Sequence, residues 1–412
     1  MKKQSPFFFV FIAVASFFAL SCGSASGTNN PYVELSYNVE LPYNVELSDI
    51  QVNVSRDPEE RNGKSYKKIV FSYPTRNVAG ESVRASAIIV MPVEYYNADP
   101  KPKFDFTVLM NHGATTAKKN VPSHGGNLAD FEKLIAGKKA VGVAADYIGF
   151  ESSAQIQAFA FGDVNARTSL QALICARKWL SSQGYTWTDK LANVGYSQGG
   201  QTAMHVQKLV DTTSVYGSIN ITKTFAGAGP YDINTTVNKS LSDYNPALAP
   251  WVVWLGLISY NRLLKMGFDE NSIFINKADI ESKVLDLEYE GGVSPAAWSD
   301  SFKGDMLDES SALRKSISKK IAGYNCNFTP KPSSKILMFS DSNDDVVPTK
   351  NSDDLFASFD ARGFAMQKKE IDTDFSEDNV YIRFSTGTFG QGTHATGSAK
   401  FMTKLAAELA NW

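Results

Sequence analysis

The sequence predicts an α/β protein with a doubly wound, mostly parallel sheet and an inserted helical cap. Short apolar segments alternate with longer segments of helical periodicity through most of the 412 residues, and this pattern is typical of strand–helix units. An interval of about a hundred residues interrupts the alternation, which is far longer than connections within a compact domain usually are. The composition, 43% hydrophobic and 20% charged residues, is that of a globular protein.

The N-terminus is predicted to be an export signal followed by a lipid attachment site. Lys2 and Lys3 precede an apolar run over residues 7–20 that is too short to span a bilayer comfortably. The run ends in Ala-Leu-Ser-Cys22, which resembles a bacterial lipobox, whose cysteine is acylated and becomes the new N-terminus. We therefore expect residues 1–21 to be a lipoprotein signal peptide and Cys22 to anchor an exported protein to a membrane, in the periplasm or at the cell surface. The alternative is an ordinary signal peptide with an incidental cysteine.

The segment over residues 22–64 is expected to be a tether and spacer. Its first residues are small and polar, as in flexible linkers, and it contains two copies of Asn-Val-Glu-Leu that suit a spacer or an edge strand. We assign residues 65–230 and 334–412 to the two parts of the core and residues 231–333 to the cap. The cap contains a strongly apolar run with two tryptophans over residues 251–260.

The core elements are expected in alternating order. They are antiparallel strands over 65–73 and 83–91, strands over 104–110 and 140–145, a helix over 163–182, a strand over 191–194, a helix over 199–209, strands over 222–226, 335–340 and 380–384, and a last helix over about 397–411.

The segment Gly195-Tyr-Ser-Gln-Gly-Gly200 joins a predicted strand to a predicted helix. It matches G-x-S-x-G in the strand–turn–helix context that this motif requires. A serine on so tight a turn forces unusual backbone angles, and the positions two before and two after it come too close to neighbouring chain for a large side chain. This explains Gly195 and Gly199, and Gly200 lets the new helix pack close to the sheet. The helix N-terminus directs N–H groups to where negative charge would form, so Ser197 is predicted to be a nucleophile.

This elbow resembles that of bacterial and fungal secreted lipases and esterases of the α/β-hydrolase superfamily, and the order of elements is similar over about residues 65–412. The resemblance implies a triad in the chain order Ser, acid, His. Many hydrolases of this group carry Gly-x-x-Asp-x-Val-Val-Pro after a late strand, and Asp344 falls on the Asp of that pattern. Asp341 stands where Gly is usual and Asp345 follows directly, so both remain alternatives for the acid.

Four histidines are available as the base: His112, His124, His205 and His394. Only His394 follows Asp344, so the chain order that the resemblance implies selects it. His205 lies in the predicted elbow helix and is expected to be a packed helical residue. No role is assigned to His124.

The pair His112-Gly113 directly follows a predicted strand. In α/β-hydrolases a His-Gly pair at this place shapes the oxyanion loop, and the next residue presents its backbone N–H to the oxyanion. The resemblance therefore implies an oxyanion hole made by the N–H groups of Ala114 and Gln198, supported by His112 and Gly113.

No cofactor, metal ion or nucleic acid is expected. A formal net charge of −2 gives no reason to expect a nucleic-acid partner. Gly227-Ala-Gly229 lacks the third glycine of a dinucleotide fingerprint, and Pro58 stands where a P-loop needs Gly. Cys and His residues lack metal-ligand spacing. An oxidising compartment would permit a disulfide between Cys175 and Cys326, but nothing in the sequence brings them together.

The expected function is a serine hydrolase that cleaves carboxylic esters through an acyl-enzyme. Its substrate would be a small-molecule, lipid or acylated-sugar ester. Two alternatives stay open, a serine peptidase of the prolyl-peptidase type and a non-catalytic surface lipoprotein of the same fold. The acyl and alcohol groups depend on the shape of the cap, which the sequence does not give.

Overall fold

The computed structural model describes residues 45–54, 59–61, 64–126, 128–135, 137–151, 156–242, 251–288 and 298–412. The predicted signal peptide, the predicted lipid attachment site at Cys22 and most of the predicted spacer lie outside these ranges. Within them, no helix combines the length and the apolar character that crossing a membrane requires.

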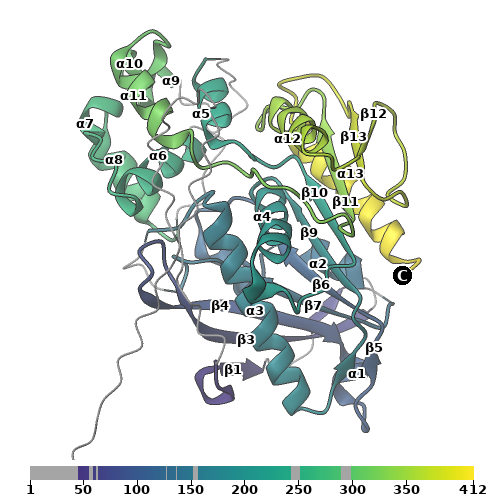
Figure 1. Ribbon diagram of the computed structural model, residues 1–412. Helices are drawn as coiled ribbons and strands as arrows, with labels where there is room; N and C mark the ends of the chain where they lie inside the picture. Colours follow the sequence, from purple (N-terminus) through teal and green to yellow (C-terminus); the bar gives the residue numbers. More distant parts are fainter. Residues whose placement is uncertain are drawn as a thin grey trace, which may run out of the picture. The chain divides into compact units, whose positions relative to one another are not determined.

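In the described part of the chain, eleven strands form one sheet (Figure 1). They are β1 (Gln51–Val54), β2 (Glu59–Arg61), β3 (Lys64–Arg76), β4 (Ser82–Pro92), β6 (Phe106–Asn111), β7 (Ala140–Ala145), β9 (Leu191–Tyr196), β10 (Lys223–Gly227), β11 (Ile336–Asp341), β12 (Gln367–Lys369) and β13 (Val380–Phe384). Their order is β1-β3-β4-β7-β6-β9-β10-β11-β13-β12, and β2 pairs with β3. The pairings from β7 to β12 are parallel, whereas β1, β2, β3, β4 and β7 are joined by antiparallel pairings.

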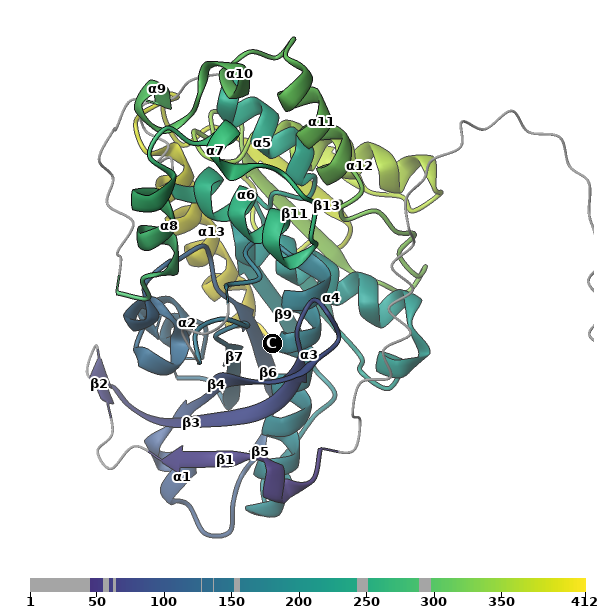
Figure 2. The same cartoon turned by 90° about the vertical axis from the view of Figure 1, so that its left-hand side faces the viewer.

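Helices cover both faces of this sheet (Figure 2). One face packs against α3 (Gly162–Ser182), α4 (Gln198–Thr212) and α12 (Lys350–Ala361), and the other against α2 (Leu128–Ile135) and α13 (Thr393–Leu409). Successive side chains of a strand point to opposite faces. In β11, accordingly, Met338 packs in the cluster of α12, while Phe339 packs in the cluster of α13. The predicted doubly wound α/β fold is confirmed.

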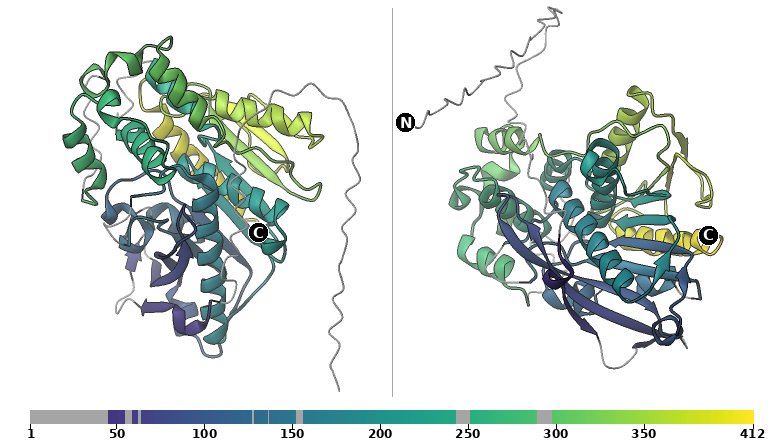
Figure 3. Two further views of the ribbon diagram at one scale, coloured as in Figure 1. Left: turned by 60° about the vertical axis from the view of Figure 1, so that its left-hand side comes forward. Right: turned by 60° about the horizontal axis from the view of Figure 1, so that its bottom comes forward.

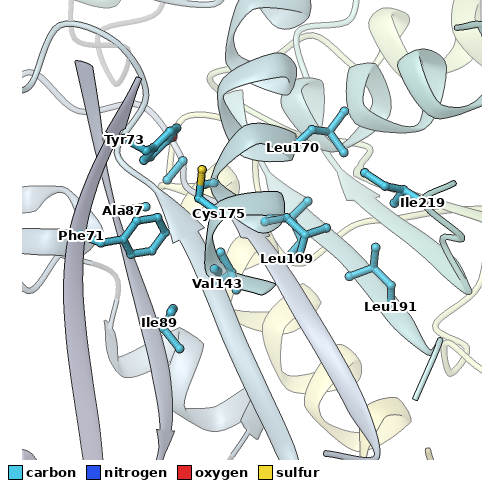
Figure 4. Packing of buried hydrophobic residues seen from close by; sticks show 14 of the residues in the cluster. Phe71, Tyr73, Ala87, Ile89, Leu109, Val143, Leu170, Cys175, Leu191 and Ile219 are labelled. Carbon is cyan, nitrogen blue, oxygen red and sulfur yellow. The ribbon is translucent and has the colours of Figure 1, made fainter. Parts of the chain in front are cut away.

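Figure 4 shows the cluster of buried side chains that joins β3 and β4 to α3. Phe71 and Tyr73 of β3 belong to it, and the Tyr73 hydroxyl donates to the carbonyl of Thr168 at 2.9 Å. Cys175 of α3 is in the same cluster, whereas Cys326 is in the cluster around α12. Both described cysteines are buried free thiols, so the disulfide that the sequence left open is not formed.

Seven helices, which we call the cap helices, occupy the described residues between β10 and β11 (Figure 3). They are α5 (Ile233–Ser242), α6 (Trp251–Leu263), α7 (Glu270–Ile273), α8 (Lys277–Leu285), α9 (Trp298–Ser301), α10 (Gly304–Leu307) and α11 (Ala312–Ile321). Their own cluster of apolar side chains includes Trp254, Ile280 and Ile317. The chain leaves the core and returns to it at one place, because Asp232 and Asn325 form an antiparallel bridge.

The remaining elements are short. They are α1 (Val93–Asn97), a separate parallel pair of β5 (Lys103–Phe104) and β8 (Thr186–Trp187), and the 3₁₀ helices η1 (Leu47–Asp49), η2 (Lys118–Asn120), η3 (Pro122–His124) and η4 (Ser214–Tyr216).

The strand expected over 65–73 and the helix expected over 199–209 each continue three residues further, to Arg76 and Thr212. Two other predicted elements also have wrong boundaries. The strand expected over 104–110 is divided at Asp105, whose N–H donates to the carbonyl of Lys139, so that the chain changes its partner from β8 to β7. The last helix begins at Thr393 instead of about residue 397. The Asp345 side chain and the Asn343 carbonyl, both in the loop after β11, hold that earlier start, as described below.

Candidate active site

Ser197 stands at the sharp turn between β9 and α4, where the sequence predicts a nucleophile. Its backbone angles are φ 59° and ψ −129°, a region that residues other than glycine rarely enter and that is found mainly at functional sites. The Ser197 N–H donates to the carbonyl of Gly227 at 2.9 Å, which ties the turn to β10. The turn therefore holds the serine in a strained conformation at the carboxyl edge of the parallel strands.

The three glycines around Ser197 occupy positions that have no space for a side chain. A Cβ atom on Gly195 would lie 2.1 Å from the carbonyl oxygen of Gly199, and one on Gly199 would lie 2.0 Å from that of Asn111. A Cβ atom on Gly200 would lie 2.2 Å from the carbonyl oxygen of Gly227. All three contacts are with backbone, which cannot move aside as a flexible side chain can. The close approaches expected from the sequence are present at each position.

His394 and Asp344 are joined directly. The Nδ1 atom of His394 lies 2.8 Å from Oδ2 and 3.0 Å from Oδ1 of Asp344. The Asp344 side chain is 0% exposed and that of His394 is 15% exposed. Oδ1 of Asp344 also accepts the N–H groups of Val346 at 2.9 Å and Val347 at 2.7 Å. The carboxylate is thus fixed by backbone donors, and the imidazole that it orients keeps access to solvent.

The other two aspartates of the loop after β11 have different partners. Oδ2 of Asp345 accepts the N–H groups of Gly392 at 2.7 Å and Thr393 at 3.2 Å, and Oδ1 accepts that of His394 at 3.0 Å. Asp341 accepts the N–H groups of Asn343 at 2.8 Å and Thr386 at 2.7 Å. Of the three acids that the sequence left open, Asp344 is the one paired with the ring of His394.

The ring of His394 and the loop after β6 both approach the turn that carries Ser197. The ring centroids of His394 and Tyr196 are 5.1 Å apart. A Cβ atom on Gly113 would lie 3.9 Å from the Cβ of Ser197. The structure therefore brings together four segments that are far apart in the sequence, namely those with Gly113, Ser197, Asp344 and His394.

His112 is buried and braces the loop that carries Gly113 and Ala114. Its ring stacks on Tyr147 with 4.1 Å between centroids, and its Nδ1 and Nε2 lie 2.7 Å and 3.2 Å from the carbonyl oxygens of Gly113 and Asp146. Burial lowers the pKa of His112, and the Gly113 carbonyl and the charge of Asp146 offset this only in part. The hydroxyl of Tyr147 donates to the carbonyl of His112 at 3.1 Å.

The two remaining histidines have local partners. His205 is buried in α4, and its Nδ1 lies 2.7 Å from Oδ1 of Asp163, to which Lys208 also donates. Burial lowers the pKa of His205, although the charge of Asp163 acts in the opposite direction. The expectation that His205 is a packed helical residue is confirmed. His124 is exposed, and its Nδ1 lies 2.8 Å from the Ser123 hydroxyl.

The cap helices adjoin the segments of the site. Ala114 of the predicted oxyanion loop and Val346 of the loop with Asp344 both pack against the apolar cluster of the cap helices. A cavity of about 210 Å³ lies between α5 and the loop after β11, and Lys239, Asp344 and Phe389 are among the residues that line it. Among the described residues, no group of three or more His, Cys, Asp or Glu side chains is arranged to hold a metal ion.

No protein-family model and no curated protein matches this sequence. Solved structures do match. An esterase from Xanthomonas oryzae, LipA, described as degrading rice cell wall, is 18% identical with a TM-score of 0.67 over 87% of this chain and 96% of its own. A protein of Legionella pneumophila subsp. pneumophila, provisionally named a hydrolase, is 16% identical with a TM-score of 0.69 over 88% of this chain and 97% of its own. Candida antarctica lipase A in its closed state is 13% identical with a TM-score of 0.62 over 93% and 87%. The mostly parallel sheet, the helices on both its faces and these likenesses agree: the chain has the α/β-hydrolase fold.

Proposed function

We propose that this protein is a serine hydrolase of carboxylic esters, with Ser197 as the nucleophile, His394 as the general base and Asp344 as the residue that orients the base. One observation carries the proposal: the side chain of His394 is hydrogen-bonded to the buried carboxylate of Asp344 beside the strained turn of Ser197. The names of two similar structures, an esterase and a lipase, support the same class of reaction.

The proposed mechanism starts from the tautomer of His394. Its Nδ1–H donates to the Asp344 carboxylate, so Nε2 has a lone pair to accept a proton from the Ser197 hydroxyl. The serine oxygen then attacks the ester carbonyl, and the protonated His394 gives its proton to the oxygen of the leaving alcohol. In the second half, His394 takes a proton from the water that attacks the acyl-enzyme and returns it to Ser197 as the carboxylic acid leaves. Asp344 stabilises the imidazolium that forms when His394 takes the proton.

The negative charge of the tetrahedral intermediate requires hydrogen-bond donors next to Ser197. We assign this role to the backbone N–H groups of Gln198, the first residue of α4, and Ala114, in the loop that His112 and Gly113 support. Removing one such donor typically costs about 10²–10³-fold in kcat.

The substrate class is proposed to be a small-molecule ester, with lipid and acylated-sugar esters as the leading candidates. A p-nitrophenyl ester series of increasing acyl length, compared with an aminoacyl-proline amide, tests this assignment on the full chain. We expect hydrolysis of at least one ester and none of the amide. Cleavage of the amide alone would favour a serine peptidase, and an unchanged rate after Ser197→Ala would contradict the proposed nucleophile.

We also propose that Cys22 carries a lipid after removal of residues 1–21, on the basis of the sequence Ala-Leu-Ser-Cys. Labelling of the expressed protein with a radioactive fatty acid should be seen in the wild type and lost in Cys22→Ser. Equal labelling of both proteins would contradict the anchor.

A further inference from the structure

The N-terminus of α13 is held by an aspartate that lies 47 to 49 residues earlier in the chain. Oδ2 of Asp345 accepts the N–H groups of Gly392 and Thr393, and Oδ1 accepts the N–H of His394. The hydroxyl of Thr393 donates to the carbonyl of Asn343 in the same loop. The helix that carries His394 is therefore joined to the loop after β11 by four hydrogen bonds, besides the one made by the imidazole.

α13 has no local substitute for this carboxylate. The residue before the helix, Gly392, has φ 76° and offers no side chain to the free N–H groups of the first turn. Such groups need acceptors, and an anionic acceptor also interacts favourably with the positive end of the helix dipole. Without Asp345, the first turn of α13 would lose its acceptors and would tend to fray. His394 is the second residue of that helix.

Asp344 and Asp345 therefore act on the same residue through different atoms. Asp344 contacts the imidazole of His394, and Asp345 contacts its backbone N–H. We infer that Asp345 is a positioning residue, which sets the place of the His394 backbone so that the imidazole can meet both Asp344 and Ser197. This inference rests on the proposed function, because it assumes that His394 is the base.

The expected effect of removing Asp345 is a loss of turnover with little change in substrate binding. A displacement of a catalytic group by about 1 Å can cost about 10²-fold in rate. We expect Asp345→Ala to lower kcat by about 10²-fold with KM changed by less than about threefold. Asp345→Asn keeps an oxygen that can accept one or two of the three N–H groups, so it should recover part of the loss.

A double-mutant cycle with His394→Ala separates positioning from general structural damage. If Asp345 acts through His394, replacing it in the His394→Ala protein should have no further effect on the residual rate. Asp269→Ala is the matched control, because Asp269 caps α7 in the cap helices by accepting the N–H of Asn271 at 3.0 Å. It should keep the kcat of the wild type. Thermal unfolding of each full-length variant checks that it is folded, and Asp345→Asn serves if Asp345→Ala does not fold.

The outcomes distinguish this inference from the proposed function. A wild-type kcat in Asp345→Ala, or in Asp345→Asn where Asp345→Ala does not fold, together with an inactive His394→Ala, overturns the role of Asp345 alone. An additive loss in the double mutant also overturns it. A wild-type rate in His394→Ala overturns the proposed function itself.

Discussion

Asp344 and His394 are 50 residues apart in the sequence, and 2.8 Å separates Oδ2 of the first from Nδ1 of the second. They meet because β11 and β13 are adjacent parallel strands, so the loops that follow them leave the same edge of the sheet. The two side chains differ in exposure, since the carboxylate is fully buried and the imidazole is partly open. The carboxylate is thus fixed by the protein around it, and the imidazole lies beside Tyr196, the residue before Ser197.

Replacing Asp344 with Asn should abolish most of the activity. The amide can donate a hydrogen bond to Nδ1 and so favours the wrong tautomer of His394, a change that costs about 10⁴-fold in kcat in a comparable triad. The measurement is kcat on the best p-nitrophenyl ester. Asp354→Asn is the control, because Asp354 forms an exposed ion pair with Lys350. This substitution should leave kcat unchanged. If Asp344→Asn retained a tenth of the activity or more, Asp344 would not be the acid.

The sequence predicts Ser197 and His394 without the structure, but it leaves the acid open. A nucleophile on a strand–turn–helix element has a local pattern, and the order of the chain leaves only one histidine after the acid. The three candidate acids lie within five positions of a single turn, and they are Asp341, Asp344 and Asp345. Local sequence preferences are the same for all three, so they do not show which one is the acid. Their roles are set by partners more than 40 residues away, and sequence patterns do not contain such contacts.

The absence of long-range contacts from sequence patterns also explains why the predicted start of the last helix is wrong. Helix starts are recognised in sequence by a nearby capping side chain, and α13 begins after a glycine, with its acceptor Asp345 in another loop. The predicted start at about residue 397 is therefore late by one turn. The strand predicted over 380–384 coincides with β13, because a run of β-branched and aromatic residues is a local signal.

Gly199, two positions after the proposed nucleophile Ser197, should not tolerate a side chain. Gly199→Ala would place a Cβ atom 2.0 Å from the carbonyl oxygen of Asn111, and we expect it to lower the free energy of unfolding by about 1–3 kcal/mol or more and to abolish ester hydrolysis. Gly256→Ala in α6 is the matched control, because its Cβ would meet nothing closer than 4.0 Å. Urea unfolding of both variants tests this, and equal stability would contradict the steric account.

The stability of the protein should fall in mild acid because of its buried histidines. Burial lowers the pKa of His205 below its ordinary value of 6.5, so at pH values between the folded and unfolded pKa the unfolded chain binds more protons. The free energy of unfolding then decreases as the pH falls below about 6.5. His205→Gln should show a shallower decrease in urea unfolding between about pH 7 and pH 5. Exposed His124→Gln should keep the wild-type slope, and an unchanged slope in His205→Gln would contradict the prediction.

The two buried thiols should be unreactive in the native protein. Burial raises the pKa of Cys175 to about 11 and also raises that of Cys326, and both are free. In a Cys22→Ser protein, Ellman's reagent at pH 8 should titrate no thiol before denaturation and both thiols in guanidinium chloride. A missing thiol after denaturation without reductant would indicate a disulfide that the structure does not contain.

The central claim is that Ser197 is a nucleophile activated by His394 and Asp344. A fluorophosphonate probe tests it most directly, because the probe reacts with an activated serine and leaves a stable adduct that peptide mass spectrometry can locate. We expect one adduct per chain, on Ser197, absent in Ser197→Ala and formed at least about 10³-fold more slowly in His394→Ala. An adduct on another serine, or labelling of Ser197 at the same rate in His394→Ala, would contradict the claim.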